Sequence, residues 1–243
     1  MLCRDVGKGE AVDTIRGARG ELVVAPIDLS DFESIRRYCR NARPGSGRRA
    51  RAQRRCSRHP RVTTVDGLEL NGATNSGRPF PLTHLLWSRL RSDARVVHVS
   101  SGGMYSQKLD VQTLFDPPEP FDGVVAYART KRAQVVLTEP FNERSTLRVS
   151  AMHPGWADTP GVQSSLPRFR RVTKAILRTP AEGADTIVWL AASPAAAHPK
   201  GRFIDRAPRP THLSRRTEES AAERRRRRAL CVRIGLDPAA SFR

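Results

Sequence analysis

The chain has 243 residues, of which 38% are hydrophobic and 28% charged, and its formal net charge is +19. This length suits one globular domain, and no stretch approaches the roughly 20 apolar residues of a membrane-spanning helix, which excludes a membrane span. Because the N-terminus turns polar at once, it predicts no secretory signal, and we expect a cytoplasmic location.

The positive charge and the cysteines are both unevenly placed. The excess charge lies mainly in residues 48–61 and 224–228, whereas the middle of the chain mixes both signs. Dense arginine attracts phosphate, so a basic nucleic-acid-binding protein is one hypothesis, favoured by charge alone. The cysteines form no C-x-x-C pair, which predicts free thiols and no metal site, at Cys3, Cys39, Cys56 and Cys231.

The first forty residues indicate an α/β unit. A short apolar start is followed by a polar helical stretch near residues 9–19 and by a β-branched run at 22–27, which predicts a buried parallel strand. Ser30 or Asp31 caps the helix that follows, which carries Phe32 and Ile35. Residues 41–59 contain almost nothing to bury, so we exclude a core strand there.

Strands and helices alternate in the rest of the chain. We predict helices at 70–91, 124–142 and 181–190 and strands at 95–103, 145–152 and 201–204. This alternation predicts an α/β fold, a Rossmann-like doubly wound parallel sheet with helices on both faces. One domain is expected over residues 1–213, followed by a polar basic helical tail at 214–243.

The sharpest signal is a phenol and an ammonium four residues apart, Tyr127 and Lys131. On a helix they project from one face, about 5–6 Å apart at Cβ. A neighbouring cation favours the ionised form of a phenol, so Tyr127 is expected to exchange a proton with a substrate oxygen. A strand upstream delivers Ser100 and Ser101 at a small-residue turn, and a strand downstream ends in the run His-Pro-Gly-Trp-Ala-Asp-Thr-Pro at 153–160.

This order of strand-Ser, helix-Tyr-Lys and strand-Pro-Gly resembles the short-chain dehydrogenase/reductase family. Residues 99–105, 127–132 and 152–161 are most similar to the branch named after family member twelve. The resemblance implies that Ser101 hydrogen-bonds the substrate oxygen, that Tyr127 is the general acid/base, and that Lys131 grips the nicotinamide ribose. It also implies hydride transfer between a nicotinamide cofactor and a small carbonyl or alcohol substrate.

The resemblance further implies a set of cofactor contacts. Arg4 matches the arginine that pairs with the 2′-phosphate of NADP, which favours NADP over NAD, although a surface charge is the alternative. Asp28 and Leu29 would contact the adenine, and Asn75 would seat a proton-relay water. The cofactor contacts also include Tyr127 and Lys131, and the nicotinamide would be bordered by Pro154, Gly155, Trp156 and Thr159.

Two hallmarks of the family are missing from this sequence. We find no glycine-rich strand-turn-helix for the pyrophosphate, so the first strand is expected to be absent. The Asn-Ala-Gly turn should fall within residues 48–60, where the arginine-rich run stands, so the fourth strand is expected to be disrupted over 41–61. A shifted reading frame would explain both the lost turn and the lost hydrophobicity of this run. The spacing from Ser101 to Tyr127 predicts an inserted loop, 105–123, that serves as part of a lid.

Three functions therefore stay open. The first is an NAD(P)-dependent oxidoreductase of the short-chain type. The second is a truncated or frame-shifted remnant that does not bind dinucleotide. The third is the nucleic-acid-binding protein, for which we expect no specific partner, and a homo-oligomer is left open.

Overall fold

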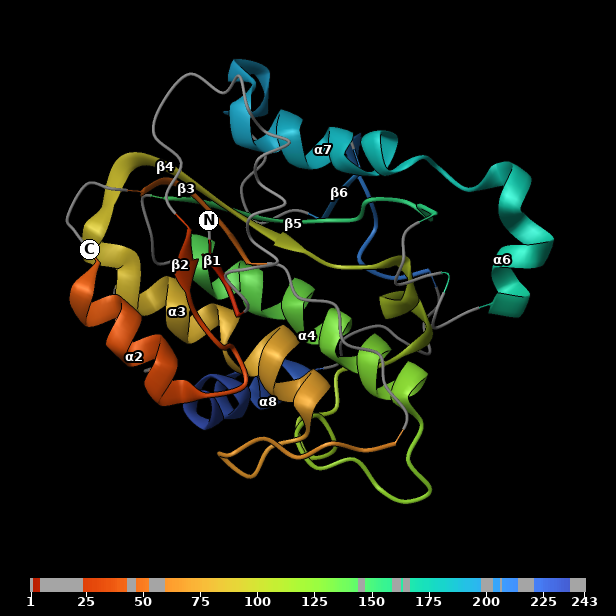
Figure 1. Cartoon of the computed structure of the whole chain (residues 1–243), viewed down its shortest axis with the longest axis horizontal. Helices are drawn as coiled ribbons and strands as arrows, with labels where there is room; N and C mark the ends of the chain where they lie inside the picture. Colours follow the sequence, from red (N-terminus) through yellow and green to blue (C-terminus); the bar gives the residue numbers. More distant parts are fainter. Residues whose placement is uncertain are drawn as a thin grey trace.

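The computed structural model describes residues 2–4, 24–42, 47–52, 60–143, 147–158, 163, 167–197, 203–205, 207–213 and 221–236. They form an α/β architecture in which helices cover both faces of the larger sheet, with α7 on one face and α3 and α4 on the other (Figure 1). The predicted fold class is confirmed. The helical stretch expected at 9–19 lies outside the described residues.

The strands form two sheets. β1 (Leu2–Cys3) and β2 (Ala25–Pro26) pair in parallel, and β3 (Gly47–Ala52), β4 (Leu90–Val99), β5 (Arg148–Met152), β6 (Phe203–Asp205) and β7 (Ala207–Pro208) follow one another in the second sheet. All neighbours are parallel except β6 and β7. In a doubly wound fold the strand order is 3-2-1-4-5-6. Among the described strands, the break therefore falls between β1 and β3, where the sequence analysis expects the first strand to be absent.

The arginine-rich segment corrects one prediction. We excluded a core strand from residues 41–59, yet Gly47–Ala52 pairs with β4 from Leu90 to His98. A parallel ladder uses main-chain N–H and C=O groups, which an arginine supplies as well as a valine does. β3 also lies at one end of the described sheet, where a strand needs only one neighbour.

The predicted helix at 70–91 is divided into shorter elements. A π-helix, Gly72–Gly77, leads into α3 (Pro79–Leu86) and a 3-10 turn, Trp87–Arg89, after which β4 begins. Proline lacks the N–H that a continuous helix needs, so Pro79 is placed at the start of α3. A Cβ on Gly77 would lie 2.9 Å from Phe115, so the π-helix needs a glycine where this ring packs.

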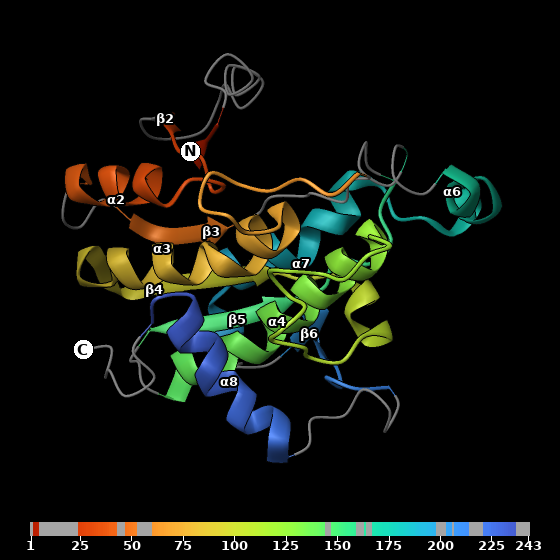
Figure 2. The ribbon, with the colours of Figure 1, turned by 90° about the horizontal axis from the view of Figure 1, so that it is seen from below.

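The remaining predicted helices are found within a few residues. α2 (Phe32–Asn41) is capped by Asp31, whose side chain accepts the Glu33 N–H at 2.9 Å. α4 (Gly123–Glu143) and α7 (Pro180–Ala192) agree with the predicted helices, and α7 begins at a Thr179 and Glu182 capping box. α6 (Pro167–Thr173), followed by a 3-10 turn Lys174–Ile176, stands out from the body in Figure 2, at the end opposite α2.

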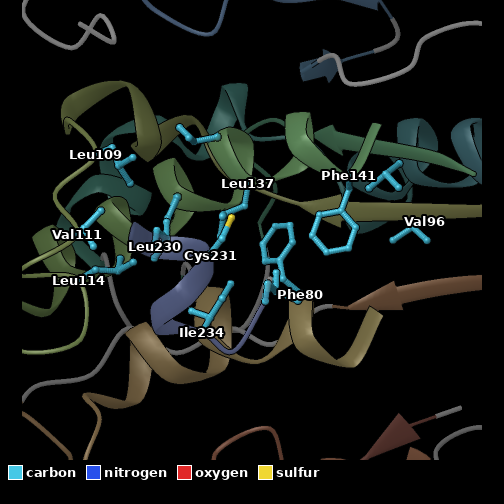
Figure 3. Close-up of a cluster of buried hydrophobic side chains, with 14 of the residues drawn as sticks. Phe80, Val96, Leu109, Val111, Leu114, Leu137, Phe141, Leu230, Cys231 and Ile234 are labelled. Atoms are coloured by element: carbon cyan, nitrogen blue, oxygen red, sulfur yellow. The ribbon is translucent and has the colours of Figure 1, made fainter. Parts of the chain in front are cut away.

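The main core lies between the sheet and α3, α4 and α8 (Ala221–Arg233) (Figure 3). It includes Leu230, Cys231 and Ile234 from the basic C-terminal segment, so this helix is formed as expected but its end is buried in the domain. It also includes four side chains of the inserted loop, which therefore packs as core and does not have the loose attachment of a lid: Leu109, Val111, Leu114 and Phe115. Within the described residues, no helix combines the length and the apolar character that crossing a bilayer requires.

Candidate active site

Helix α4 brings the predicted phenol and ammonium together. The Lys131 Nζ lies 5.4 Å from the centroid of the Tyr127 ring, as the four-residue spacing requires. Tyr127 is half-buried, whereas Lys131 is only 2% exposed. A charge inside the protein needs hydrogen-bond acceptors, and Lys131 Nζ donates to the main-chain oxygen of Val99 at 2.8 Å and to Gln134 Oε1 at 3.0 Å.

The end of β4 is held against the same turn of α4. Ser100 Oγ donates to the main-chain oxygen of Lys131 at 2.8 Å, and the Ser100 N–H donates to Met152 on β5 at 2.8 Å. Ser101 follows, half-buried, and its Oγ accepts the Gly103 N–H at 3.3 Å as the cap of a 3-10 turn, Gly102–Ser106. The serine turn and the Tyr-Lys pair are thus joined by a direct hydrogen bond.

Asn75 reaches this group through a residue that the sequence analysis missed. Asn75 is buried in the π-helix, its Nδ2 donates to Thr130 Oγ1 at 3.2 Å, and its main-chain oxygen accepts Gln134 Nε2 at 2.6 Å. The main-chain carbonyl of Asn75 therefore already has a hydrogen-bond partner, the Gln134 side chain. Gln134 lies three residues after Lys131, a spacing that places two side chains on one helix face, and this spacing was the available signal.

The turn after β5 carries the predicted nicotinamide contacts. Gly155 has a φ of +75°, and a Cβ there would lie 2.6 Å from the Arg178 side chain. Arg178 donates to Asp205 on β6 at 3.1 and 3.2 Å and to the Pro154 carbonyl at 3.3 Å. Trp156 is 41% exposed, and Thr159 lies outside the described residues.

His153, between β5 and this turn, connects the two strand ends. A Cβ on Gly102 would lie 3.1 Å from the His153 ring, so the turns after β4 and β5 are adjacent. Burial lowers the pKa of His153, since it disfavours the charged imidazole. This histidine is a second residue that the sequence analysis did not single out.

An ion pair joins the turn after β5 to α6. Arg170 donates to both carboxylate oxygens of Asp158, at 2.7 and 2.9 Å. The hydrogen bonds from Arg170 lower the pKa of Asp158 to about 2. The carboxylate therefore stays charged at neutral pH and keeps its partner.

The predicted adenosine contacts lie on the smaller sheet. Arg4 is exposed just after β1, and Asp28 and Leu29 follow β2, so parallel pairing puts all three at one sheet edge. The Asp28 carboxylate accepts the Ser30 N–H at 2.8 Å and its hydroxyl at 2.6 Å, which forms a local turn.

Arg78 links the end of the π-helix to the start of α2. The sequence places this cation beside the Asn75 turn, and the structure buries it against Asp66 at 2.5 Å. The same carboxylate accepts the Phe32 N–H at 3.1 Å, and the Arg78 guanidinium lies 4.6 Å from the Phe32 ring centroid. The turn that holds Asn75 is thereby fixed to the start of α2.

Sequence comparison with known proteins identifies the family of this chain. Dehydrogenase/reductase SDR family member 12 of Homo sapiens is 40% identical over 236 residues, which cover 91% of this chain and 73% of that protein. The chain belongs to the short-chain dehydrogenase/reductase family. A second relative is retinol dehydrogenase 14 of Mus musculus. It is 28% identical to this chain, over 92% of this chain and 69% of its own length. Comparison with protein-family profiles gives no match.

Solved structures agree on the fold. An uncharacterised protein from Mycobacterium paratuberculosis superposes on this short-chain dehydrogenase/reductase with a TM-score of 0.75 and 24% identity, over 99% of this chain and 85% of the other. The angucycline C-6 ketoreductase LanV with bound NADP gives a TM-score of 0.59 and 18% identity, over 87% and 82%. At these identities the likeness concerns the fold alone.

Proposed function

We propose that this chain is an NAD(P)-dependent oxidoreductase that acts on a small carbonyl or alcohol substrate. One observation supports the proposal above the others. The half-buried Tyr127 ring has a fully buried ammonium, Lys131, 5.4 Å from its centroid, and the serine-bearing end of β4 is bonded to the same helical turn at 2.8 Å. Proton transfer, charge stabilisation and substrate hydrogen bonding are thus available from one place.

The residues divide the chemistry between them. A bound nicotinamide cofactor supplies hydride to a carbonyl carbon, or accepts it from an alcohol carbon. In reduction Tyr127 Oη gives its proton to the carbonyl oxygen, and in oxidation it takes the hydroxyl proton back. Lys131 stabilises the charge that remains on the phenolic oxygen, and Ser101 Oγ hydrogen-bonds the substrate oxygen.

The residues proposed to contact the cofactor suit both its nicotinamide end and its adenine end. Lys131 would position the ribose beside Tyr127, and Asn75 would seat a proton-relay water. Pro154, Gly155, Trp156 and Thr159 would border the nicotinamide. Leu29 and Asp28 would contact the adenine. The exposed Arg4 guanidinium at the end of β1 suits a 2′-phosphate, so we propose that NADP is preferred over NAD.

Cofactor titration with the whole chain tests the proposal. We expect NADPH to bind more tightly than NADH in a fluorescence titration, and turnover to be detected with an aldehyde panel that includes retinal, because several relatives are named retinol dehydrogenases. Tyr127→Phe should lower kcat by about 100-fold or more, the usual contribution of a general acid/base. Tyr38→Phe, a half-buried tyrosine of α2, is the matched control and should keep full activity. Equal activity of both variants would remove Tyr127 from the mechanism.

One observation favours the alternative of a remnant that does not bind dinucleotide. The described strands form two separate sheets, and residues 48–60 contain no Asn-Ala-Gly turn. The same titration separates the two proposals. Absence of NADPH binding at millimolar concentration would support the remnant and overturn the enzyme.

A further inference from the structure

The Gln134 side chain spans the two groups that would otherwise need separate partners. It lies one helical turn after Lys131 on α4 and is 2% exposed. Its Oε1 accepts Lys131 Nζ at 3.0 Å, while its Nε2 donates to the main-chain oxygen of Asn75 at 2.6 Å. We propose that Gln134 is a positioning residue, which fixes the Lys131 ammonium beside Tyr127 by bridging it to the π-helix.

The chemistry of the two ends allows only one kind of bridge. An ammonium only donates and a peptide carbonyl only accepts, so the group between them must offer an acceptor on one side and a donor on the other. A neutral carboxamide does this with both ends satisfied. A carboxylate would face the Asn75 oxygen without a proton to share, and an apolar side chain would leave both groups with one partner fewer.

The bridge also determines what Lys131 can do. A carboxamide holds its protons at neutral pH, so Gln134 orients the ammonium but does not accept a proton from it. Lys131 therefore acts as a fixed charge beside the phenol.

Two neighbours of the Lys131 and Gln134 pair bear on the test of this role. Burial, and secondly the Lys131 charge, lower the pKa of His98 on β4 to about 3. His98 is thus uncharged when the phenol titrates. Thr138 Oγ1 donates to the Gln134 main-chain oxygen at 2.8 Å, so its hydroxyl bonds the main chain of Gln134 and not the bridging carboxamide.

This inference rests on the proposed function, and a readout that needs no turnover separates the two. The chain contains three tyrosines. In a Tyr38→Phe, Tyr105→Phe background, Tyr127 is therefore the single phenol, and its ionisation is followed by ultraviolet phenolate absorbance in cofactor-free protein. Lys131→Met, Gln134→Met and the matched control Thr138→Val are compared in this background.

We expect Lys131→Met to raise the titration midpoint by about 1–3 pH units, since it removes the neighbouring charge. Gln134→Met should raise it in the same direction by about 1 unit, because the ammonium loses an acceptor and spreads over several rotamers. Thr138→Val should leave it unchanged. If methionine disturbs the fold, Gln134→Asn, which is one methylene too short for the bridge, gives the same comparison.

The outcomes are distinct. A midpoint that moves in Lys131→Met but stays in Gln134→Met overturns the role of Gln134 and leaves the proposed function standing. A midpoint that moves in neither variant removes the Tyr-Lys pair, and with it both proposals. An equal shift in Thr138→Val would show that any lost polar contact on this face has the same effect, which also overturns the positioning role.

Discussion

His98 offers a direct test of how the site is buried. It lies on β4, fully buried, with its ring stacked on Phe80 at 4.2 Å between centroids. Neither ring nitrogen has a hydrogen-bond partner among the described residues. Burial, and secondly the Lys131 charge, lower the pKa of His98 from 6.5 to about 3. The perturbation is His98→Phe, which keeps a flat ring on Phe80 and removes the titration.

The size of the effect follows from the two pKa values. Between about pH 6.5 and 3 the unfolded chain binds the imidazole proton while the folded chain does not, so the free energy of unfolding falls as the pH falls. From about pH 7 to about pH 5, His98 alone should remove about 2 kcal/mol. For a chain of this size that corresponds to about 4–8 °C in Tm.

The assay compares the two proteins at both pH values. Urea unfolding of the wild type and of His98→Phe gives the pH-dependent loss for each, and every other titrating group cancels in the difference. We expect the wild type to lose about 2 kcal/mol more than the variant. Parallel losses in the two proteins would refute the reasoning, because they would show that His98 becomes protonated without unfolding.

Three further changes test the elements that build the site. Phe115→Ala empties a position beside the π-helix and should lower the free energy of unfolding, measured in urea, by about 3–5 kcal/mol. A loss below about 1 kcal/mol would contradict core packing of the inserted loop. Thr179→Ala removes the capping box of α7 and should lower the free energy of unfolding by about 1 kcal/mol. Thr179→Ser is the control, because it retains the capping hydroxyl. Gly155→Ala strains a positive φ by about 1–3 kcal/mol and displaces Arg178 from Asp205, so both Tm and NADPH affinity should fall; an unchanged Tm would speak against the strain.

The sequence alone determined the features that depend on near neighbours. Helix periodicity placed α4 within one residue at each end, Asp31 was recognised as one of two possible caps, and the four-residue spacing placed Tyr127 beside Lys131. The order of strands and helices predicted the parallel sheet and its two covered faces. These features follow from local propensity and side-chain periodicity, which a linear sequence contains directly.

Tertiary structure decided the features that depend on distant partners. Gln134 and Asn75 are 59 residues apart, and nothing near either residue in the sequence indicates that their polar groups meet. β3 forms because β4 offers main-chain partners. The end of the basic C-terminal segment is buried because Leu230 and Ile234 pack in the same core cluster as side chains of α4 and the inserted loop. Main-chain pairing is indifferent to side-chain type, and packing depends on the shape of the opposing surface. Both therefore required the folded chain.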